Sequence, residues 1–509
     1  MKNRIFRYII GVFVISTSLV SCSLDTSPTD AVEESKVFTT TADNEKVLTG
    51  AWGQLMESFY TYANPGYGAF LRAGDAMGSD VVLNGRYGFR DHYAFKALYG
   101  RGGTNTHSWE LTYNTINNVN HVIAKVDAAE GSVNDKKRIK GQALALRGFM
   151  YLHLASNYSF AIDVNPNALT APIYLEPTTI NSSPKALASV SELYNQAIKD
   201  LEEALSLIPD TQTYKRGNAK DKIDQEVVLG LLSRATLYAR DWEKAKKYSD
   251  ALLAINSYLM TEEEYKGGFN DASNKEWIWG HQQTPNQSDA SYQFNFLDVT
   301  SKESFYFSFN ADPYFREMFE EGDYRKKMIY WAPDPANDKP KEGDEAYMRY
   351  AKFKFKAGQI ADIVLMRTSE IYLINAEAKA QLGDGDALNR LNALKVARGA
   401  SQVSGLQGKD LLEAIWIERR KELFGEGFSL VDIIRNQQSV VRKSYPQTKR
   451  VPFSYEVLDS NGKVNIVTVN LLPLGHRILN FPDQSNFVPN SKYYLFRVPL
   501  VEERENGNI

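Results

Sequence analysis

The sequence has a single cysteine, Cys22, among its 509 residues, and it has only six histidines. One cysteine cannot form an internal disulfide, and it cannot complete a multi-cysteine metal site. None of the histidines stands at the paired spacing of an H-E-x-x-H motif. We therefore predict no metal site and no cofactor.

The motifs of common enzymes are also missing. The sequence contains no G-x-S-x-G, no phosphate-cradling glycine loop followed by lysine, and no dinucleotide fingerprint between a strand and a helix. With 62 acidic residues, neighbouring carboxylates are unavoidable, so their presence alone does not indicate a glycosidase. A net charge of −3 without a long Lys/Arg cluster gives no footprint for nucleic acid. We expect a protein that is not an enzyme and that binds no nucleic acid.

Long hydrophobic runs are absent after the first 22 residues. In that segment Lys2, Arg4 and Arg7 precede an uncharged, largely apolar stretch from residue 8 to residue 20. This stretch is short for a membrane-spanning helix and is typical of a targeting signal. We predict that residues 1–22 are a signal peptide and that no other part of the chain spans a membrane.

The signal ends in Leu-Val-Ser-Cys, which resembles the cleavage box of bacterial lipoproteins. Cleavage would leave Cys22 at the N-terminus, where several acyl chains can be attached and can anchor the protein stably. The sequence Cys-Ser-Leu-Asp at 22–25 looks like an acidic signal for export to the cell surface, and the polar residues 23–36 form a tether. We expect a protein that is lipid-anchored in the outer membrane and faces the cell exterior.

A helical hairpin between residues 363 and 435 organises the rest of the chain. Apolar residues recur at three- and four-residue steps in both halves of this hairpin, so each half has one apolar face. Gly383 is expected to end the first helix in a left-handed conformation, and Asp386 is expected to cap the second. This pattern is typical of a tetratricopeptide unit, which cannot bury its apolar face without neighbours.

Further helical segments flank two interruptions rich in glycine and aromatic residues. Ser189 and Glu192 form a capping box before a periodic helix at 190–208, and Asp241 is the expected cap of a helix at 242–255. Residues of about 62–106 and 260–360 break the helical pattern, and turn residues at 459–462 predict a β-hairpin. The predicted fold of residues 37–509 is therefore mainly α: a tetratricopeptide-like helical-repeat scaffold with a large irregular, loop-rich subdomain and minor β-hairpins.

Several motifs in this order resemble the SusD/RagB family of outer-membrane nutrient-binding lipoproteins. They are GDAMGSDVV at 74–82, ALRGFMYLHLA at 145–155, R-x-x-E…A-E at 367–377, E-R-x-x-E-L…E-G at 418–427 and P-x-x-E-x-x-x-N at 499–506. After Glu-Gly the sequence departs from the family pattern, because Phe428 and Ser429 stand where the family often has arginine and an aromatic residue. The motifs together cover nearly the whole chain.

The resemblance implies a tetratricopeptide-like bundle and a role in nutrient capture. Such a protein would be the lid-like partner of a TonB-dependent outer-membrane transporter of SusC type. It would bind an oligomeric nutrient, most often a glycan, and deliver that ligand to the transporter. These motifs are mainly scaffold motifs, so they do not identify the ligand or the residues that touch it.

Charged residues at 418–422 are best interpreted as part of the scaffold. Glu418 and Glu422 lie one turn apart on a predicted helix, where Arg419 or Arg367 of another helix could neutralise them. A structural ion-pair network explains this pattern better than a pair of catalytic carboxylates.

The aromatic content is the most informative feature for ligand binding, with 25 Phe, 29 Tyr and 7 Trp. Sugar rings present C–H faces that stack on exposed aromatic rings, while polar neighbours bind their hydroxyl groups. Phe294 and Phe296, and also Phe305, Phe307 and Phe309, alternate as on one face of a core strand. The candidate ligand-binding residues, with Trp331 as the leading one, instead lie in polar loops of the two interruptions: Asn84, Arg86, Tyr87, Arg90, Tyr93, Tyr292, Tyr306, Tyr330 and Trp331.

Three alternatives to glycan capture stay open at the level of sequence. Peptide capture, for which the family also has precedent, would require an acidic or aromatic cleft without stacking platforms. A surface glycoside hydrolase would require substrate turnover and two carboxylates about 5 to 10 Å apart in a cleft. A purely structural tetratricopeptide adaptor would bind a protein segment on its concave face and no small ligand.

Overall fold

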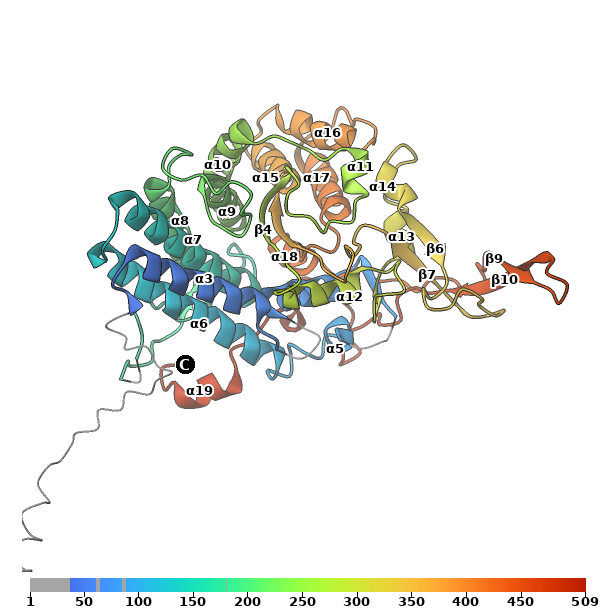
Figure 1. Ribbon diagram of the computed structural model, residues 1–509, viewed down its shortest axis with the longest axis horizontal. Coiled ribbons are helices and arrows are strands. Elements are labelled where there is room, and N and C mark those ends of the chain that lie inside the picture. Colours follow the sequence, from blue (N-terminus) through green and yellow to red (C-terminus); the bar gives the residue numbers. More distant parts are fainter. Residues whose placement is uncertain (1–36, 61–64, 85–87, 180) are drawn as a thin grey trace, which may run out of the picture.

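The computed structural model describes residues 37–60, 65–84, 88–179 and 181–509. The signal peptide, the tether and Cys22 lie outside the described residues, and so do Arg86 and Tyr87. The long helices between residues 41 and 381 pack on one another in chain order, apart from the one at 66–77. The next two helices, at 387–397 and 408–422, both pack on the helix at 368–381 (Figure 1). The predicted helical-repeat architecture is confirmed.

The long helices have these bounds: α3 Thr41–Glu57, α4 Gly66–Met77, α6 Thr104–Lys125, α7 Val133–Asn157, α8 Val190–Leu207, α9 Gln225–Tyr238, α10 Trp242–Ile255, α15 Thr368–Gln381, α16 Ala387–Ala397, α17 Gly408–Glu422. The short helices are α5 Arg90–Tyr93, α11 Glu262–Tyr265, α12 Phe294–Leu297, α13 Pro313–Arg316, α14 Tyr324–Lys327, α18 Ser429–Arg435 and α19 Leu500–Glu505, with 3-10 turns η1 Val126–Ala128, η2 Asp289–Gln293 and η3 Lys492–Tyr494. In the described part of the chain, no helix is long and apolar enough to cross a membrane.

Local signals place several helix ends as predicted. The side chain of Ser189 accepts from the backbone N–H of Glu192, and the Glu192 carboxylate accepts in return from the backbone of Ser189. Asp241 caps α10, and Gly383 has a φ of +69° just after α15. The predicted cap at Asp386 is wrong, because its carboxylate binds the Lys379 ammonium at 2.7 Å and makes no capping hydrogen bond. An ion pair with the preceding helix replaces the cap.

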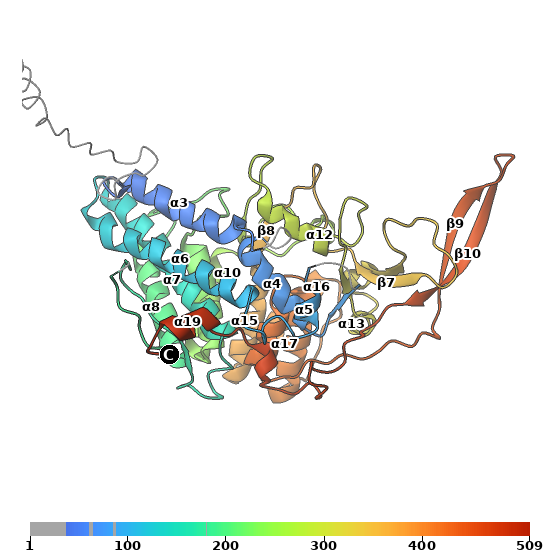
Figure 2. The ribbon, with the colours of Figure 1, turned by 90° about the horizontal axis from the view of Figure 1, so that it is seen from below.

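Strands are few and lie mainly in the second half of the chain. Their bounds are β1 Val81–Leu83, β2 Leu169–Ala171, β3 Ala188–Ser189, β4 Trp277–His281, β5 Phe309–Ala311, β6 Ile329–Ala332, β7 Glu345–Tyr350, β8 Ile363–Arg367, β9 Val451–Leu458 and β10 Val464–Pro473. They form the pairs β1-β5, β2-β3 and β4-β8 and one sheet in the order β6-β7-β10-β9. The predicted hairpin is confirmed as β9 and β10, and it projects far from the body of the molecule (Figure 2).

The first interruption is less irregular than predicted, because it contains the twelve-residue helix α4. Its glycines permit close packing, which is why a glycine-rich sequence is helical here. A Cβ atom on Gly68 would lie 1.6 Å from the side chain of Gln293, and one on Gly66 would lie 2.1 Å from the carbonyl oxygen of Met56. Gly66 also has a φ of +51°. Glycine therefore indicates a crowded helix rather than a loop at these positions.

The second interruption also differs in detail from the prediction. Phe294 and Phe296 belong to the short helix α12, not to a strand, although both are buried as expected. Phe309 and Phe307 are buried, but Phe305 is 58% exposed. The predicted strand is therefore wrong at 304–308, because the chain turns there although its aromatic residues alternate.

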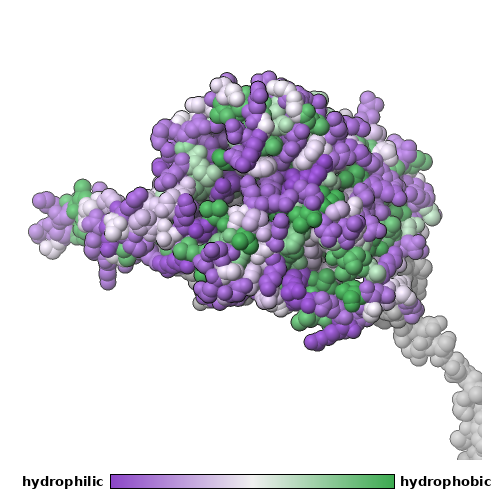
Figure 3. All heavy atoms as spheres, turned by 180° about the vertical axis from the view of Figure 1, so that it is seen from behind, coloured by the Kyte–Doolittle hydropathy of each residue, from purple (hydrophilic) through white to green (hydrophobic). Residues whose placement is uncertain are grey.

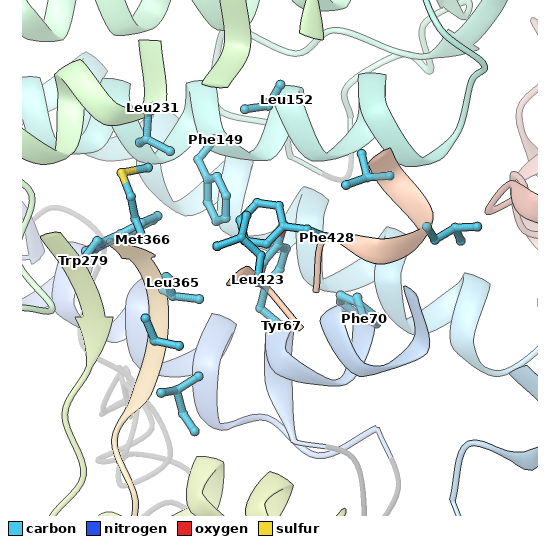
Figure 4. Packing of buried hydrophobic residues seen from close by; sticks show 14 of the residues in the cluster. Tyr67, Phe70, Phe149, Leu152, Leu231, Trp279, Leu365, Met366, Leu423 and Phe428 are labelled. Atoms are coloured by element: carbon cyan, nitrogen blue, oxygen red, sulfur yellow. The ribbon is translucent and has the colours of Figure 1, made fainter. Parts of the chain in front are cut away.

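One large hydrophobic core joins the two halves of the molecule. Figure 4 shows rings and aliphatic side chains from α4, α7, α9, β4, β8 and the 423–431 segment converging in it. Trp277 and Trp279 are fully buried, and the ring of Trp279 lies 5.0 Å from that of Phe149. The loop-rich half is therefore packed against the helical half and not merely tethered to it.

A buried ion-pair network connects the two ends of the α15–α18 segment, as predicted. Glu422 pairs with Arg367, with Arg398 at 2.9 Å and with Arg325 at 2.6 Å. Burial alone would raise the pKa of Glu422, but the charges of these three arginines hold that pKa well below its usual range. Glu418 accepts from both Arg325 and Lys421, so neither carboxylate is available for chemistry.

Candidate ligand-binding site

The two interruptions meet at a short antiparallel pairing. Val81 of β1 pairs with Ala311 of β5, and Leu83 pairs with Phe309, so the ends of both strands are fixed relative to each other. Asn84 follows β1 directly and donates to the carbonyl oxygens of Tyr306 and Phe307 at 3.3 and 3.4 Å. Two segments more than 200 residues apart in the sequence therefore share one surface.

Four aromatic residues gather beside Asn84, and we call Phe59, Tyr292, Phe305 and Tyr306 the aromatic cluster. The ring of Tyr292 lies 6.1 Å from that of Phe59 in an edge-to-face arrangement and 6.2 Å from that of Tyr306. The hydroxyls of Tyr292 and Tyr306 are hydrogen-bonded at 3.0 Å, and the ring of Phe305 lies 6.3 Å from that of Tyr306. Phe59 is 39% exposed and Phe305 is 58% exposed, so the cluster presents ring surface to solvent.

A buried aromatic base supports this cluster. The ring of Tyr306 stacks on that of Phe296 at 4.8 Å with an interplanar angle of 21°, and Phe89 contacts Phe296 from the side at 5.1 Å. Gly88 has a φ of +89°, and a Cβ atom there would lie 2.4 Å from the ring of Phe296. Glycine is therefore required where the chain crosses the base of the cluster.

The turn that carries Phe305 and Tyr306 is organised by one residue. The carbonyl oxygen of Asn295 accepts from Ser304 Oγ at 2.7 Å and from the backbone N–H of Tyr306 at 3.0 Å. Its side-chain oxygen accepts from the backbone N–H of Phe305 at 3.1 Å. This hydrogen bonding fixes the backbone that carries Phe305, whose ring contacts Tyr306 and is otherwise largely exposed.

A second polar group holds Tyr292 next to Phe59, and we call Glu57, His281 and Gln283 the Glu57 clamp. Glu57 ends α3, and its carboxylate accepts from the backbone N–H of Ala290 at 2.7 Å, from Gln283 Nε2 at 2.6 Å and from His281 Nε2. His281 Nδ1 accepts from the indole N–H of Trp52 at 3.1 Å, so the proton of this imidazole lies on Nε2 and points at Glu57.

The electrostatics of the clamp favour an ionised Glu57. Burial would raise its pKa, but the hydrogen bonds from His281 and Gln283 outweigh burial and lower the pKa below its ordinary value of 4.5. Gln283 also accepts from the backbone N–H of Ser291 at 3.1 Å. The clamp therefore fixes η2, which carries Tyr292, against the end of α3, which precedes Phe59.

The structure places the predicted candidates in different surroundings. Asn84, Tyr292 and Tyr306 come together in the cluster, whereas Arg90 lies exposed at the start of α5. Tyr93 is only 6% exposed; its hydroxyl hydrogen-bonds His476 at 2.7 Å and its ring lies under Arg442 at 4.1 Å. The hydroxyl and the ring of Tyr93 are therefore already engaged by other residues of the protein.

The leading candidate, Trp331, lies on β6 in the four-stranded sheet rather than in the cluster. Its ring is 5.6 Å from that of Tyr445, and it packs on the small hydrophobic group formed by Ala346, Val469 and Leu471. It is half-buried, whereas its neighbour Tyr330 is exposed. The expectation that Trp331 is a free stacking surface does not fit this packing.

Two members of the cluster were not among the predicted candidates. The alternation of Phe305 with Phe307 and Phe309 predicts a core strand instead of a binding residue. Phe59 follows the end of a helix and has no loop motif that would indicate a binding role. Only the position of Phe59 next to Tyr292 in the fold identifies it.

The cluster is suited to holding a ligand by stacking and hydrogen bonding. Phe59 and Phe305 expose ring surface, hydrogen bonds fix the backbone around them, and the tyrosine hydroxyls and the Asn84 amide lie close by. The residues that the structure describes contain no group of His, Cys, Asp or Glu side chains that could hold a metal ion.

Comparisons with known proteins identify relatives over nearly the whole chain. Residues 30–237 match a family model described as starch-binding associating with outer membrane, and residues 260–461 match the SusD family. A SusD-like carbohydrate binding protein from Bacteroides vulgatus is 60% identical with a TM-score of 0.87, and the match covers 93% of this chain and 98% of that one.

More distant relatives share the fold. A SusD superfamily protein, also from Bacteroides vulgatus, is 20% identical with a TM-score of 0.72. The match covers 92% of this chain and 98% of that one. A SusD-like protein of Formosa agariphila is 23% identical over 86% of this chain and 92% of its own length. This chain belongs to the SusD/RagB family.

Proposed function

We propose that this protein is a cell-surface lipoprotein that binds an oligosaccharide at the aromatic cluster and delivers it to a SusC-like TonB-dependent transporter. The observation that carries the proposal is the pair of exposed rings of Phe59 and Phe305 beside the half-buried ring of Tyr292, on a backbone that hydrogen bonds hold in place. The 60% identical relative, which is named a carbohydrate binding protein, supports a saccharide as the ligand class.

The geometry explains why a saccharide is a suitable ligand. Sugar rings have C–H faces that pack against aromatic rings, and their hydroxyls exchange hydrogen bonds with hydroxyl and amide groups. Because the Glu57 clamp and Asn295 already fix the ring positions, little conformational freedom is lost when the ligand binds. The protein acts by binding alone, so the ligand is released unchanged.

A matched pair of variants tests the cluster. Replacing both Phe59 and Tyr292 by alanine should raise the Kd for the bound polysaccharide by roughly tenfold or more, because each ring contributes about 1 kcal/mol. Tyr99→Ala is the control, since Tyr99 is an exposed aromatic residue like Phe59 but lies outside the cluster. The purified protein is titrated with a panel of polysaccharides and with peptides.

The outcomes separate the alternatives. Binding of a glycan that is lost only in the double variant supports the proposal, whereas binding of peptides and of no glycan identifies a peptide-capturing protein. The recovered glycan should have its original chain length after long incubation. Shortened products would instead indicate a glycoside hydrolase.

The anchor and the partner have their own tests. Cys22→Ala should move the protein from the outer-membrane fraction to the soluble fraction, because the acyl chains cannot be attached. Affinity purification of the lipidated protein from its own membranes should recover a TonB-dependent barrel. Recovery without any such barrel would contradict delivery to a transporter.

A further inference from the structure

A hollow lies on the helical half of the molecule and includes none of the aromatic cluster. It has a volume of about 390 Å³, within the range of about 300 to 1,000 Å³ that is typical of small-ligand pockets. Its walls are one face of α6, residues 172–179 and 182–184 after β2, and α19, which lies beside α6 (Figure 2). We call it the α6 pocket.

The wall opposite α6 is fixed by side chains of that helix. Tyr113 donates its hydroxyl hydrogen to the carbonyl oxygen of Pro172 at 2.8 Å, and Asn120 donates to the carbonyl oxygen of Tyr174 at 3.0 Å. Asn117 accepts from the backbone N–H of Thr178 at 2.7 Å. A segment without regular secondary structure is thus held at a set distance from the helix, so the hollow is preformed.

The end wall is tied to the same segment. Asn506, which follows α19, donates to the carbonyl oxygen of Lys185 at 2.9 Å, and Asn508 donates to that of Pro184 at 2.8 Å. Arg101 donates to the carbonyl oxygen of Val498 at 2.8 Å and thereby holds the start of α19. Three segments that are distant in the sequence therefore enclose one volume.

Aromatic rings line the pocket. The rings of Trp109 and Tyr113 are 4.8 Å apart, and that of Tyr174 lies 6.0 Å from Tyr113 at an interplanar angle of 90°. Trp109 is 6% exposed, and the two tyrosines are half-buried. The pocket therefore combines flat apolar surface with a polar rim.

Three polar side chains of the rim are not used by the fold. Glu110, Asn114 and Glu505 line the pocket and are exposed, and within the described residues their side chains have no hydrogen-bond or ion-pair partner. Glu502 also lines it, and no lysine or arginine does. A ligand in this pocket meets aromatic faces, amides and negative charge.

We propose that the α6 pocket is a second saccharide-binding site, which takes a neutral or amine-bearing sugar ring and excludes sugars that carry a carboxylate or a sulfate. Hydroxyl and ammonium groups donate hydrogen bonds to the carboxylates and amides of the rim, and the C–H face of the ring packs on Tyr113 and Tyr174. An anionic sugar would bring its charge next to Glu110, Glu502 and Glu505. The ammonium of Lys185 lies over the Tyr174 ring at 5.3 Å, but the three carboxylates that line the pocket outweigh this one charge. The proposal does not require the aromatic cluster to bind glycan.

The test uses monosaccharide probes and a variant of the rim. Glucose, glucosamine and glucuronate are titrated into the purified protein by saturation-transfer NMR, in the native sequence and in a Tyr292→Ala background that weakens the aromatic cluster. The same probes are soaked into crystals to locate the bound ring. The rim variant combines Glu110→Gln with Asn114→Ala. Both positions are exposed, so the melting temperature should stay unchanged.

The proposal predicts that glucose and glucosamine bind in both backgrounds and that the crystals show a ring against Tyr113. The rim variant should weaken their binding roughly tenfold, as expected for the loss of one or two hydrogen bonds. Glu243→Gln, at an exposed position of α10 outside the pocket, should have no effect. Glucuronate should bind at least several-fold more weakly than glucose.

Two results would overturn the proposal. One is that no ring occupies the pocket in soaked crystals while the rim variant binds glucose like the native protein. The other is that glucuronate binds there as well as glucose does. Loss of polysaccharide binding in Phe59 and Tyr292 variants concerns the aromatic cluster only, so the two proposals fail or stand separately.

Discussion

The α15–α18 segment and the aromatic cluster use side chains in opposite ways. In the first, the charges of Glu422, Arg367 and Arg398 are fully buried and each is paired. In the second, apolar rings such as Phe305 are exposed, while the polar groups beneath them hold the backbone. The comparison teaches that the buried charges maintain the frame, whereas the unburied rings are the part of the surface that is free to bind.

Surface composition alone does not reveal this division. Seen from behind, hydrophobic residues are scattered among hydrophilic ones over the body and the projecting hairpin (Figure 3). Several exposed apolar side chains lie on that hairpin, including Leu458 and Ile466. What distinguishes the aromatic cluster is therefore the fixed backbone under its rings, not exposure by itself.

The largest expected effect is on the frame. Glu422→Gln would leave Arg367, Arg398 and Arg325 buried around a neutral group, and breaking such a network costs about 3 to 5 kcal/mol. The free energy of unfolding, measured by denaturant titration, should fall by that amount. Glu243→Gln on α10, an exposed glutamate, should change it by less than about 0.5 kcal/mol. Equal effects at the two positions would contradict the structural role of the network.

A smaller loss of stability is expected at Trp331. Its ring packs on Val469 and Leu471 and contacts Tyr445, so Trp331→Ala should destabilise the protein by about 2 kcal/mol, less than the cost at a fully buried ring. The Kd for polysaccharide should stay unchanged. Tyr330→Ala, at the exposed neighbouring position, serves as the control for stability. A higher Kd with an unchanged melting temperature would instead show that Trp331 belongs to the binding surface.

The sequence predicts the frame well because its signals are local. The capping box of Ser189 and Glu192, the left-handed Gly383 and the hairpin of β9 and β10 depend on neighbours a few residues apart. It also predicts the pairing of Arg367 with Glu422, since a buried charge needs a partner.

The binding surface is harder to predict because it depends on contacts between distant segments. Phe59 and Tyr292 are neighbours only because the Glu57 clamp joins α3 to η2. Phe305 resembles a core residue until the turn organised by Asn295 exposes it. No periodicity in the sequence contains this information.

A variant at the exposed ring of Phe305 should affect ligand binding but not stability, which distinguishes the binding surface from the frame. Phe305→Ala should raise the Kd for polysaccharide about fivefold, in line with the loss of roughly 1 kcal/mol of stacking. The melting temperature should stay within experimental error, because the side chain buries little surface in the folded protein. Isothermal titration and thermal denaturation of the same preparation measure both. A clear fall in melting temperature would mean that Phe305 belongs to the frame.

The smallest expected effect concerns pH and the Glu57 clamp, which lies between the frame and the surface. The pKa of Glu57 is lowered in the folded protein, so its ionised form contributes stability above its ordinary pKa of 4.5. That contribution is lost as the pH falls through the lower, folded pKa, because protonation removes the acceptor for His281 and for the backbone of Ala290. Glu57→Gln cannot titrate, so its melting temperature should fall less than that of the native protein between about pH 5 and 3. Parallel pH profiles for the two proteins would show that the charge of Glu57 does not hold Tyr292 against Phe59, and the rigidity of the cluster would then have to come from Asn295 and the ring stack on Phe296 alone.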